Sequence, residues 1–441
     1  MPPRTLGPLL LSASLLTLAC EPQPQDGWAG TTVDSAGLRI VTNPTEPLWS
    51  PEEGWWVDEV LRIDPDESVP ETLFGYIVDA DLDSQGRVYA LDEAGPFVRV
   101  FVADGAALGT LGGPGGGGLT ARVYDPEAAA RPSPRNPGRG PGLLGGIMTS
   151  LVVLQDTIVV ADWSQGHLDR WGPDGMILDP LPMPGEWSRT QGWLEAEGDR
   201  LWVRIEELSV EGPEEAIRKA DRLFLLEPPE AEPVLQFDYR SSDLGARGAP
   251  RLPLIPNAPI WAPLPDGRVA WSTLESAEIR IAEWTGDGPA RPSGRIRSPG
   301  WRARSPTPTD LEALRILMRE EMETRGAPAD ARDRVPLVDP PFLPVMTDLA
   351  AGPDGTLWVQ RTGDLRQAHP KVTNFTRRYP GAWGGSTWDV LDGAGRYLGS
   401  VELPRRFRLM AFRGDLLVGA VADSRNVDAL VVLRVNRPPS D

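Results

Sequence analysis

Short stretches in which apolar and polar residues alternate recur along most of the chain, with tight turns between them. The clearest copy reads VDADLDSQGRVYALD over residues 78–92 and FVRVFVADGAALGTLG over 97–112. An alternation with period two indicates β-strands that each bury one face. Asp-Gly and Gly-Asp pairs separate the strands and are typical of hairpin turns, because both residues tolerate positive φ. The pattern therefore predicts an all-β chain built from four-stranded units.

The unit occurs six times, and its second strand is the easiest to locate. The second strand of the first copy lies within 78–92, and the other five are predicted at 157–162, 200–205, 268–272, 356–360 and 416–423. Four-stranded repeats of about 40–45 residues are typical of propeller blades, which stack their apolar faces on their neighbours. We therefore predict a six-bladed β-propeller over residues 36–437. Trp202, Trp271 and Trp358 lie inside second strands, so we expect them to pack between blades.

Residues beyond the repeats form long insertions. They cover 113–146, 206–220, 239–257, 292–342 and 362–386. The turns between first and second strands, and between third and fourth strands, are short, so the insertions all belong to connections on the opposite face of a propeller. Insertions that gather on one face indicate a binding surface, whereas simple drift in loop length would scatter over both faces.

One insertion contains the only well-patterned helix, predicted over residues 309–325. Thr309 is the expected N-cap and Glu312 completes a capping box. The expected apolar positions are Leu311, Leu314, Ile316 and Met318. We expect this helix to lie across the elaborated face.

The N-terminus has the layout of an export signal. A weakly positive start precedes an apolar stretch over residues 6–18, which is shorter than the roughly 20 apolar residues that cross a bilayer. The following letters, TLAC at 17–20, resemble the bacterial lipobox, in which the cysteine after the cleavage point carries lipid. We predict a signal peptide over 1–19 and a lipid anchor and flexible stalk over 20–35, with Cys20 as the anchor. An ordinary signal peptide with an incidental cysteine is the alternative.

Composition limits the partners. The chain has 44 Lys and Arg against 63 Asp and Glu, and loss of the signal peptide removes one more positive charge, Arg4. A strongly acidic chain repels nucleic acid and anionic lipid. We therefore expect no nucleic-acid partner, and membrane contact through the lipid anchor only. Cys20 is the single cysteine, so no internal disulfide is expected.

Several stretches resemble a known repeat. VADWSQGHLDRWGPDG (160–175) and VADSRNVDALVV (421–432) are similar to the NHL-type repeat, in which a strand ending Val-Ala-Asp precedes a short loop and an apolar strand. LAAGPDGTLWVQR (349–361) and WDVLDGAGRYLGSVELP (388–404) resemble the same repeat in bacterial six-bladed β-propeller lipoproteins of the NHL and TolB-like superfamily. The resemblance implies the fold and a place in the cell envelope, on the periplasmic or outer-membrane side. It leaves the activity open, since such propellers include lactonases, lyases and binding platforms.

Aspartates at the ends of second strands are the candidate metal ligands. Asp92, Asp162 and Asp423 end second strands on the elaborated face. Carboxylates around a propeller mouth can hold Ca²⁺, as in lactonase-type propellers, but such aspartates also form Asx-turns with their own loops. Apart from this Ca²⁺ alternative, we expect no cofactor.

A cationic and aromatic cluster in 362–386 is the main candidate for binding. We expect it to contact a protein, peptide or glycan ligand together with His167 and the three aspartates. Its members are Arg366, His369, Arg377, Arg378 and Trp383. The alternative is a solvated loop whose cations pair with nearby acids.

Catalytic motifs are missing from the sequence. It has no HExxH, GxSxG or GxxxxGK motif, and its two histidines cannot build a three-histidine zinc site. We name no catalytic residue, and we favour a lipid-anchored binding or scaffold module over an enzyme. The alternative function is a divalent-metal-dependent hydrolase or lactonase that uses carboxylates at the propeller mouth.

The N-terminal segment must also close the ring. Residues 37–43 or 57–63 can supply the outer strand of the last blade, beside 431–436. If 37–43 does so, the stalk enters from the face with short turns, and the insertions point away from the membrane. The other strand leaves that orientation open.

Overall fold

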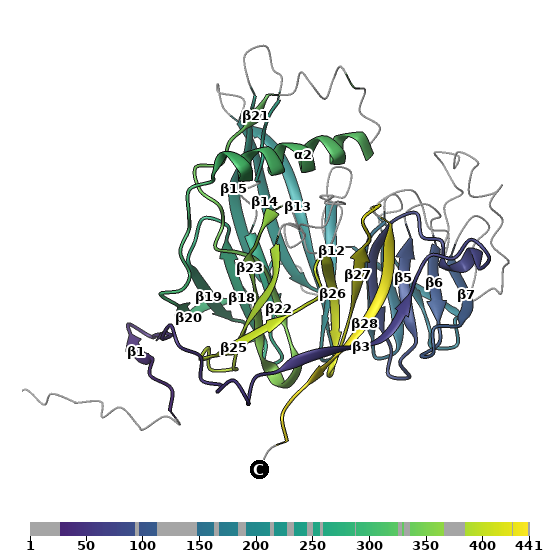
Figure 1. Cartoon of the computed structure of the whole chain (residues 1–441), viewed down its shortest axis with the longest axis horizontal. Helices are drawn as coiled ribbons and strands as arrows, with labels where there is room; N and C mark the ends of the chain where they lie inside the picture. The colour runs from purple at the N-terminus through teal and green to yellow at the C-terminus, as the bar shows by residue number, and fades with distance from the viewer. Residues whose placement is uncertain are drawn as a thin grey trace, which may run out of the picture.

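The computed structural model describes residues 27–439 except for 93–96, 113–147, 163–166, 184–190, 212–215, 227–232, 245–249, 256–258, 287, 325–328, 330–335, 366–383 and 426. Six β-sheets follow one another along the chain and form a six-bladed β-propeller (Figure 1). The fold predicted from the alternation and the turn pairs is confirmed. Two of the six sheets have six strands, and the other four have four strands as predicted.

The first three blades follow chain order. Blade 1 contains β4 (Ile77–Leu82), β5 (Val88–Asp92), β6 (Phe97–Phe101) and β7 (Ala107–Gly112). Blade 2 contains β8 (Met148–Leu154), β9 (Thr157–Asp162), β10 (His167–Trp171) and β11 (Ile177–Pro182). Blade 3 contains β12 (Gln191–Glu197), β13 (Arg200–Glu211), β14 (Ala216–Leu225), β15 (Leu235–Leu244), β16 (Pro250–Pro253) and β21 (Leu337–Val338).

The last three blades include strands from the N-terminus. Blade 4 contains β17 (Pro259–Pro263), β18 (Arg268–Thr273), β19 (Glu278–Glu283) and β20 (Arg291–Arg297), with β2 (Leu38–Thr42) and β1 (Thr31–Ser35) added at its edge. Blade 5 contains β22 (Met346–Ala351), β23 (Leu357–Thr362), β24 (Gly384–Leu391) and β25 (Tyr397–Glu402). Blade 6 contains β26 (Phe407–Arg413), β27 (Leu416–Ala422), β28 (Asp428–Asn436) and β3 (Trp56–Ile63).

Apolar clusters between neighbouring blades form the core. Trp202 and Trp358 are fully buried, and Trp271 packs against Phe237 of blade 3 with ring centroids 4.7 Å apart. These contacts confirm the prediction that the tryptophans of the second strands pack between blades.

Buried aspartates on the innermost strand of blade 1 tie it to blade 2. The Oδ2 atom of Asp79 accepts hydrogen bonds from the Leu151 backbone N–H at 2.9 Å and from the Ser150 hydroxyl at 2.8 Å. The Oδ2 atom of Asp81 accepts one from the Val153 N–H at 2.7 Å. Both aspartates are fully buried, and these bonds satisfy them. The alternating aspartates of this strand therefore join adjacent blades.

The ring is closed by β3, because β3 pairs antiparallel with β28 from Trp56 opposite Asn436 to Ile63 opposite Leu430. Of the two segments left open by the sequence, 57–63 is therefore the closing strand and 37–43 is not. Ile63 is 4% exposed within the core between blades 1 and 6. β3 also begins on the side of the short turns, because it is antiparallel to β28, which ends there.

The earlier strands reinforce blade 4 instead. β2 runs parallel to β20, and β1 pairs back onto β2 as an exposed hairpin. Val41 of β2 is 2% exposed because it packs between blades 4 and 5. The predicted stalk over 20–35 overlaps this hairpin at its end. Residues 27–63 thus cross the outer edges of blades 4, 5 and 6, and we call them the N-terminal strap.

The elaborated side rises above the ring. Much of the 206–220 insertion is an extension of β13 and β14, which pair as far as Glu211 opposite Ala216. The 239–257 insertion includes the end of β15 and all of β16, while β20 occupies the start of 292–342. Figure 1 shows β13, β14, β15 and the helix α2 (Pro308–Thr324) on one side, with β1 and the C-terminal end on the other.

Helix α2 confirms the predicted helix, and it begins one residue earlier than predicted, at Pro308. The capping pair is Thr307 and Asp310: the Thr307 hydroxyl accepts a hydrogen bond from the Asp310 N–H at 3.2 Å, and Asp310 accepts one from the Thr307 N–H at 2.8 Å. The predicted pair of Thr309 and Glu312 is therefore wrong. Hydrogen bonds from Arg304 hold the pKa of Asp310 well below its usual value.

The apolar face of α2 differs from the prediction at one position. Leu314 is fully buried and Met318 is 8% exposed, but Ile316 is 45% exposed. Leu314 and Met318 pack with Leu254 and Leu343 in a cluster of their own. The helix is thus held on a small second core above the ring.

Replacement of the capping residue tests this arrangement. Thr307→Ala is expected to destabilise α2 by about 1 kcal/mol, because the Asp310 N–H loses its acceptor. Hydrogen exchange of the first-turn amides should speed up while exchange in blade 2 is unchanged. Thr309→Ala, two residues later, is the matched control and should leave the exchange rates near those of the parent. Equal effects of the two variants would contradict the assignment of Thr307 as the cap.

Candidate functional site

Asp92, the first of the predicted strand-end aspartates, lies buried in a closed network. Its Oδ1 atom accepts hydrogen bonds from the N–H groups of Gly75 and Tyr76, and its Oδ2 atom accepts two from Arg99, at 3.0 and 2.8 Å. The Arg99 guanidinium also donates to the Leu73 carbonyl at 2.6 Å. The described geometry makes Asp92 part of the junction between the N-terminal end of blade 1 and its second strand.

Asp423, at the same place in blade 6, is exposed and forms an Asx-turn. Its carboxylate accepts hydrogen bonds from the N–H groups of Arg425 and Val427 at 2.7 and 2.9 Å, and the Arg425 side chain lies 3.0 Å away. The backbone hydrogen bonds lower the pKa of Asp423. His167 lies on β10, where its Nε2 atom is 3.2 Å from Asp169. Within the described contacts, each of these three strand-end groups engages its own blade.

The other predicted binding residues cannot be placed. The side chain of Asp162 lies outside the described residues, although its backbone ends β9. The cationic and aromatic cluster also lies outside the described residues; its members are Arg366, His369, Arg377, Arg378 and Trp383. Their role in binding stays a prediction.

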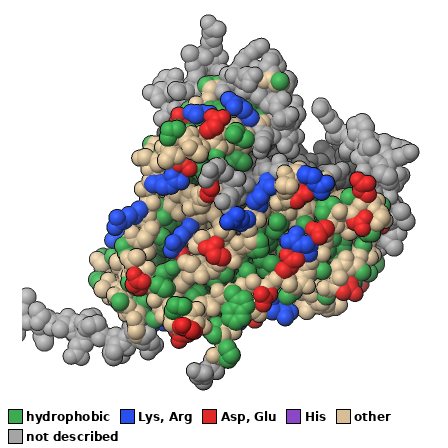
Figure 2. All heavy atoms as spheres, in the orientation of Figure 1, with side chains coloured by type: hydrophobic (Ala, Val, Ile, Leu, Met, Phe, Trp, Pro, Cys, Tyr) green, Lys and Arg blue, Asp and Glu red, His purple; other side chains and the backbone are tan. Residues whose placement is uncertain are grey.

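Among the described residues, no three His, Cys, Asp or Glu side chains come together in a way that would hold a metal ion. The described ranges also contain no helix with the length and apolarity needed to cross a bilayer. On the face shown in Figure 2, Lys and Arg side chains are interspersed with Asp and Glu over the blades.

A large cavity lies on the other side of the ring, where the turns between first and second strands converge. It has a volume of about 700 Å³, which is within the range of small-molecule sites. All six blades contribute to its lining. One residue from each is Asp83, Asp156, Glu197, Pro265, Asp354 and Arg413. We call this space the central cavity.

Three acids of the central cavity are paired within the protein. Asp83 accepts hydrogen bonds from the Arg87 Nε at 2.5 Å and from the Tyr89 hydroxyl at 3.0 Å. Asp156 accepts two from Ser84 of blade 1, at 2.8 and 2.6 Å, and these bonds lower its pKa. Asp354 forms an ion pair of 2.9 Å with Arg437.

The guanidinium of Arg413 crosses from blade 6 to blades 1 and 2. It donates to the buried Oδ2 atom of Asp81 and, at 2.6 Å, to the Val153 carbonyl. Because Asp81 also accepts from the Val153 N–H, the three inner strands are joined at one point. Arg413 is thus a fixed positive charge at the wall of the cavity.

Glu197 differs from these groups. It ends β12 on the cavity wall, and no described residue forms a hydrogen bond or ion pair with its carboxyl group. The pKa of Glu197 is raised to about 7, chiefly by burial; Arg413 and Arg200 lower it, while Glu195 and Asp266 add to the rise. At neutral pH this carboxyl group is therefore a mixture of its charged and uncharged forms.

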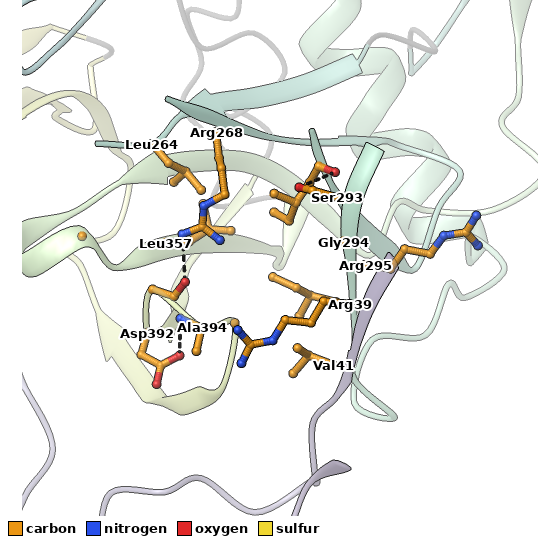
Figure 3. Close-up of a pocket in the computed structure, with 15 residues that line it drawn as sticks. Arg39, Val41, Leu264, Arg268, Ser293, Gly294, Arg295, Leu357, Asp392 and Ala394 are labelled. Carbon is orange, nitrogen blue, oxygen red and sulfur yellow. Dashed lines mark hydrogen bonds between the residues drawn. The ribbon is translucent and has the colours of Figure 1, made fainter. Parts of the chain in front are cut away.

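A second, much smaller cavity lies between blades 4 and 5 (Figure 3). Its volume is about 50 Å³, enough for a few water molecules at most. Arg268 donates to the Gly393 carbonyl at 2.9 Å across this seam, and the Arg39 side chain of β2 points toward the turn that contains Asp392 and Ala394. We assign this space to the contact between the N-terminal strap and the two blades.

Sequence reasoning did not single out Glu197 or Arg413. The signal was available, because both residues lie next to Gly-Asp pairs, at 198–199 and 414–415, which mark the first turns of blades 3 and 6. Every first turn of a propeller faces the central axis on the same side. Charged residues beside those turns can therefore be grouped from the repeat alone.

No family model and no curated protein matches the sequence of the chain. Solved structures do resemble this six-bladed β-propeller. They include a protein described as exported from Bacteroides fragilis, at TM-score 0.42 and 12% identity, covering 90% of this chain and 99% of that one. A member of the DUF4221 family from Bacteroides vulgatus has a TM-score of 0.40 and 11% identity, covering 88% of this chain and 100% of that one. Virginiamycin B lyase from Staphylococcus aureus has a TM-score of 0.38 and 10% identity, covering 86% and 99%. At these scores the resemblances carry no inference about activity.

Proposed function

We propose that the chain is a lipid-anchored extracytoplasmic binding or scaffold protein of the bacterial cell envelope, which presents its elaborated side to a protein, peptide or glycan. The observation that carries this proposal is the placement of the elaborated side and of β1, at the start of the N-terminal strap, at opposite sides of the ring (Figure 1). Asn43 of the strap donates to the Gly395 carbonyl in a turn of the short-turn side, and its Oδ1 atom accepts from Trp28 at 3.3 Å.

Chain length limits how far the anchor can lie from that side. Seven residue steps separate Cys20 from Gly27, which span at most about 25 Å when fully extended. A lipid on Cys20 therefore keeps the short-turn side near the bilayer. The NHL-type resemblance supports the same cell compartment, and β23 ends at Thr362 and β24 begins at Gly384 on the side that would face outward.

The hydrolase alternative has less support among the described residues. Asp92 is enclosed by Arg99 and backbone donors, and Asp423 is used by its own turn. Because the protein itself already uses both carboxylates, these contacts favour the binding function over the hydrolase.

Orientation can be measured with two engineered thiols in a Cys20-lipidated chain on vesicles. Ile316→Cys places a thiol on α2, where Ile316 is 45% exposed; Met176→Cys places one in the turn after β10, on the short-turn side, where Met176 is 62% exposed. A membrane-impermeant thiol reagent should modify the first variant at the same rate with and without vesicles and the second more slowly on vesicles.

Two results would count against the proposal. If vesicles slow the modification of the α2 thiol more than that of the turn thiol, the orientation is the reverse of the one proposed. Recovery of a Cys20→Ser chain in the membrane fraction, in the same amount as the parent, would remove the lipid anchor.

A further inference from the structure

The central cavity is lined by the short turns, on the opposite side of the ring from the elaborated side, so it offers a binding site separate from the one in the proposed function. It lies where six first turns meet, and apolar side chains complete its wall, including Leu82, Val153 and Phe412. A cavity of about 700 Å³ whose wall combines apolar side chains with charged groups is large enough for a small organic molecule.

The pairing of its charged groups indicates which atom a ligand would satisfy. Asp83, Asp156 and Asp354 each have partners within the protein, and Arg413 is held by Asp81. Glu197 alone among the charged groups of this wall has neither a hydrogen bond nor an ion pair with the described chain. A half-buried carboxylate without a partner is unfavourable, and a ligand that supplies a positive charge or a hydrogen-bond donor relieves that cost.

We propose that the central cavity binds a small organic cation, a primary amine with an apolar body, whose ammonium group pairs with Glu197. The apolar body packs against the first turns of blades 1, 2 and 6. The wall indicates that the ligand carries a positive charge. Its carboxylates outnumber its guanidinium groups, and the guanidinium of Arg413 is already paired with the buried carboxylate of Asp81. An anion would meet Glu197 as a like charge.

Binding of such a ligand is linked to protons. The charged groups that act on Glu197 are Glu195 and Arg200 of its own hairpin, Asp266 of blade 4 and Arg413 of blade 6. Because the pKa of Glu197 is raised to about 7, its ionised fraction grows about tenfold between pH 6 and pH 8. An ammonium ligand stabilises the ionised form and lowers this pKa, so its binding near pH 7 releases about half a proton.

Calorimetry with the mature full-length chain tests the proposal, with hexylamine as the probe. Hexanol and hexanoate are the uncharged and anionic matches of the same chain length, and hexylamine stays protonated throughout this pH range, like a lysine side chain. We expect hexylamine to bind about tenfold more weakly at pH 6 than at pH 8. Its binding enthalpy at pH 7 should vary with the ionisation enthalpy of the buffer in the sense of proton release.

Two variants identify the residue responsible. Glu197→Gln keeps the shape of the side chain and should weaken hexylamine at least about tenfold and remove the pH dependence. Asp415→Asn lies in the first turn of blade 6 but outside the cavity wall. It should leave the affinity for hexylamine and its pH dependence unchanged, and it controls for the loss of one surface carboxylate. Thermal unfolding of both variants confirms that they are folded.

The contrary outcomes are distinct. Equal hexylamine affinity in the parent and in Glu197→Gln, or no measurable hexylamine binding, overturns the site. Tighter binding of hexanoate with proton uptake overturns the sign of the ligand. None of these results depends on the lipid anchor or on the elaborated side, so failure of this site and failure of the proposed function are distinguishable.

Discussion

Ile63→Asp is expected to destabilise the propeller by more than about 4 kcal/mol, because it places a carboxylate without a partner in the closing seam of the ring. Ile63 is 4% exposed and packs between blades 6 and 1 together with Ile77 and Leu430. Loss of its apolar burial alone is worth about 1.5–3 kcal/mol. Urea denaturation followed by circular dichroism measures the change in the free energy of unfolding.

Val60→Asp is the matched control in the same strand. Val60 is 44% exposed and lies at the bulge where the register between β3 and β28 shifts. Its replacement is expected to change the free energy of unfolding by no more than about 0.5 kcal/mol. If the two variants shift the denaturation midpoint equally, β3 does not close the ring in the way that we describe.

The repeat pattern was sufficient for most of the ring. Alternating strands and Asp-Gly turns are local signals, and they located the second strands of all six blades, including β9 at Thr157–Asp162. Five blades contain four strands that are consecutive in the chain, and blade 6 contains three consecutive strands and β3 from the N-terminal segment. The pattern therefore determines the blades without any knowledge of long-range contacts.

Ring closure could not be decided in the same way. Both 37–43 and 57–63 alternate, and either can cover an apolar edge. The choice depends on partners hundreds of residues away: Val41 packs beside Ile296 and Tyr397, whereas Ile63 packs beside Leu430. Parallel addition of β2 to β20 has no turn that would announce it in the sequence. The same limit applies to α2, whose sequence allows capping by either Thr307 or Thr309.

The candidate site was predictable only as a surface. The insertions were assigned to one side because connectivity in a propeller fixes the side of each loop, and Figure 1 shows the described insertions there. The burial of Asp92 and the lack of a partner for Glu197 both depend on packing between distant segments, such as the Arg99 side chain over the turn before β4. Residue type and spacing along the chain do not predict such packing.

Replacement of the two strand-end aspartates gives the second large effect and tests the metal alternative at the same time. Asp92→Ala is expected to destabilise the protein by about 3–5 kcal/mol, because it leaves the buried Arg99 guanidinium without its carboxylate. Asp423→Ala occupies the same place in blade 6, but its carboxylate is exposed and serves only its own turn, so we expect a midpoint near that of the parent. Urea denaturation of the two variants measures both effects.

The contrast between the two aspartates separates structure from metal binding. If both are structural in the way that we describe, the parent and the Asp423→Ala variant respond alike to added Ca²⁺. A Ca²⁺-dependent rise in the parent's midpoint that Asp423→Ala abolishes would instead assign the strand ends to a metal site, since a ligand that binds only the folded state stabilises it by mass action. Because Asp92 accepts at least four hydrogen bonds from the described part of the protein, we expect its large effect to persist in the presence of a chelator.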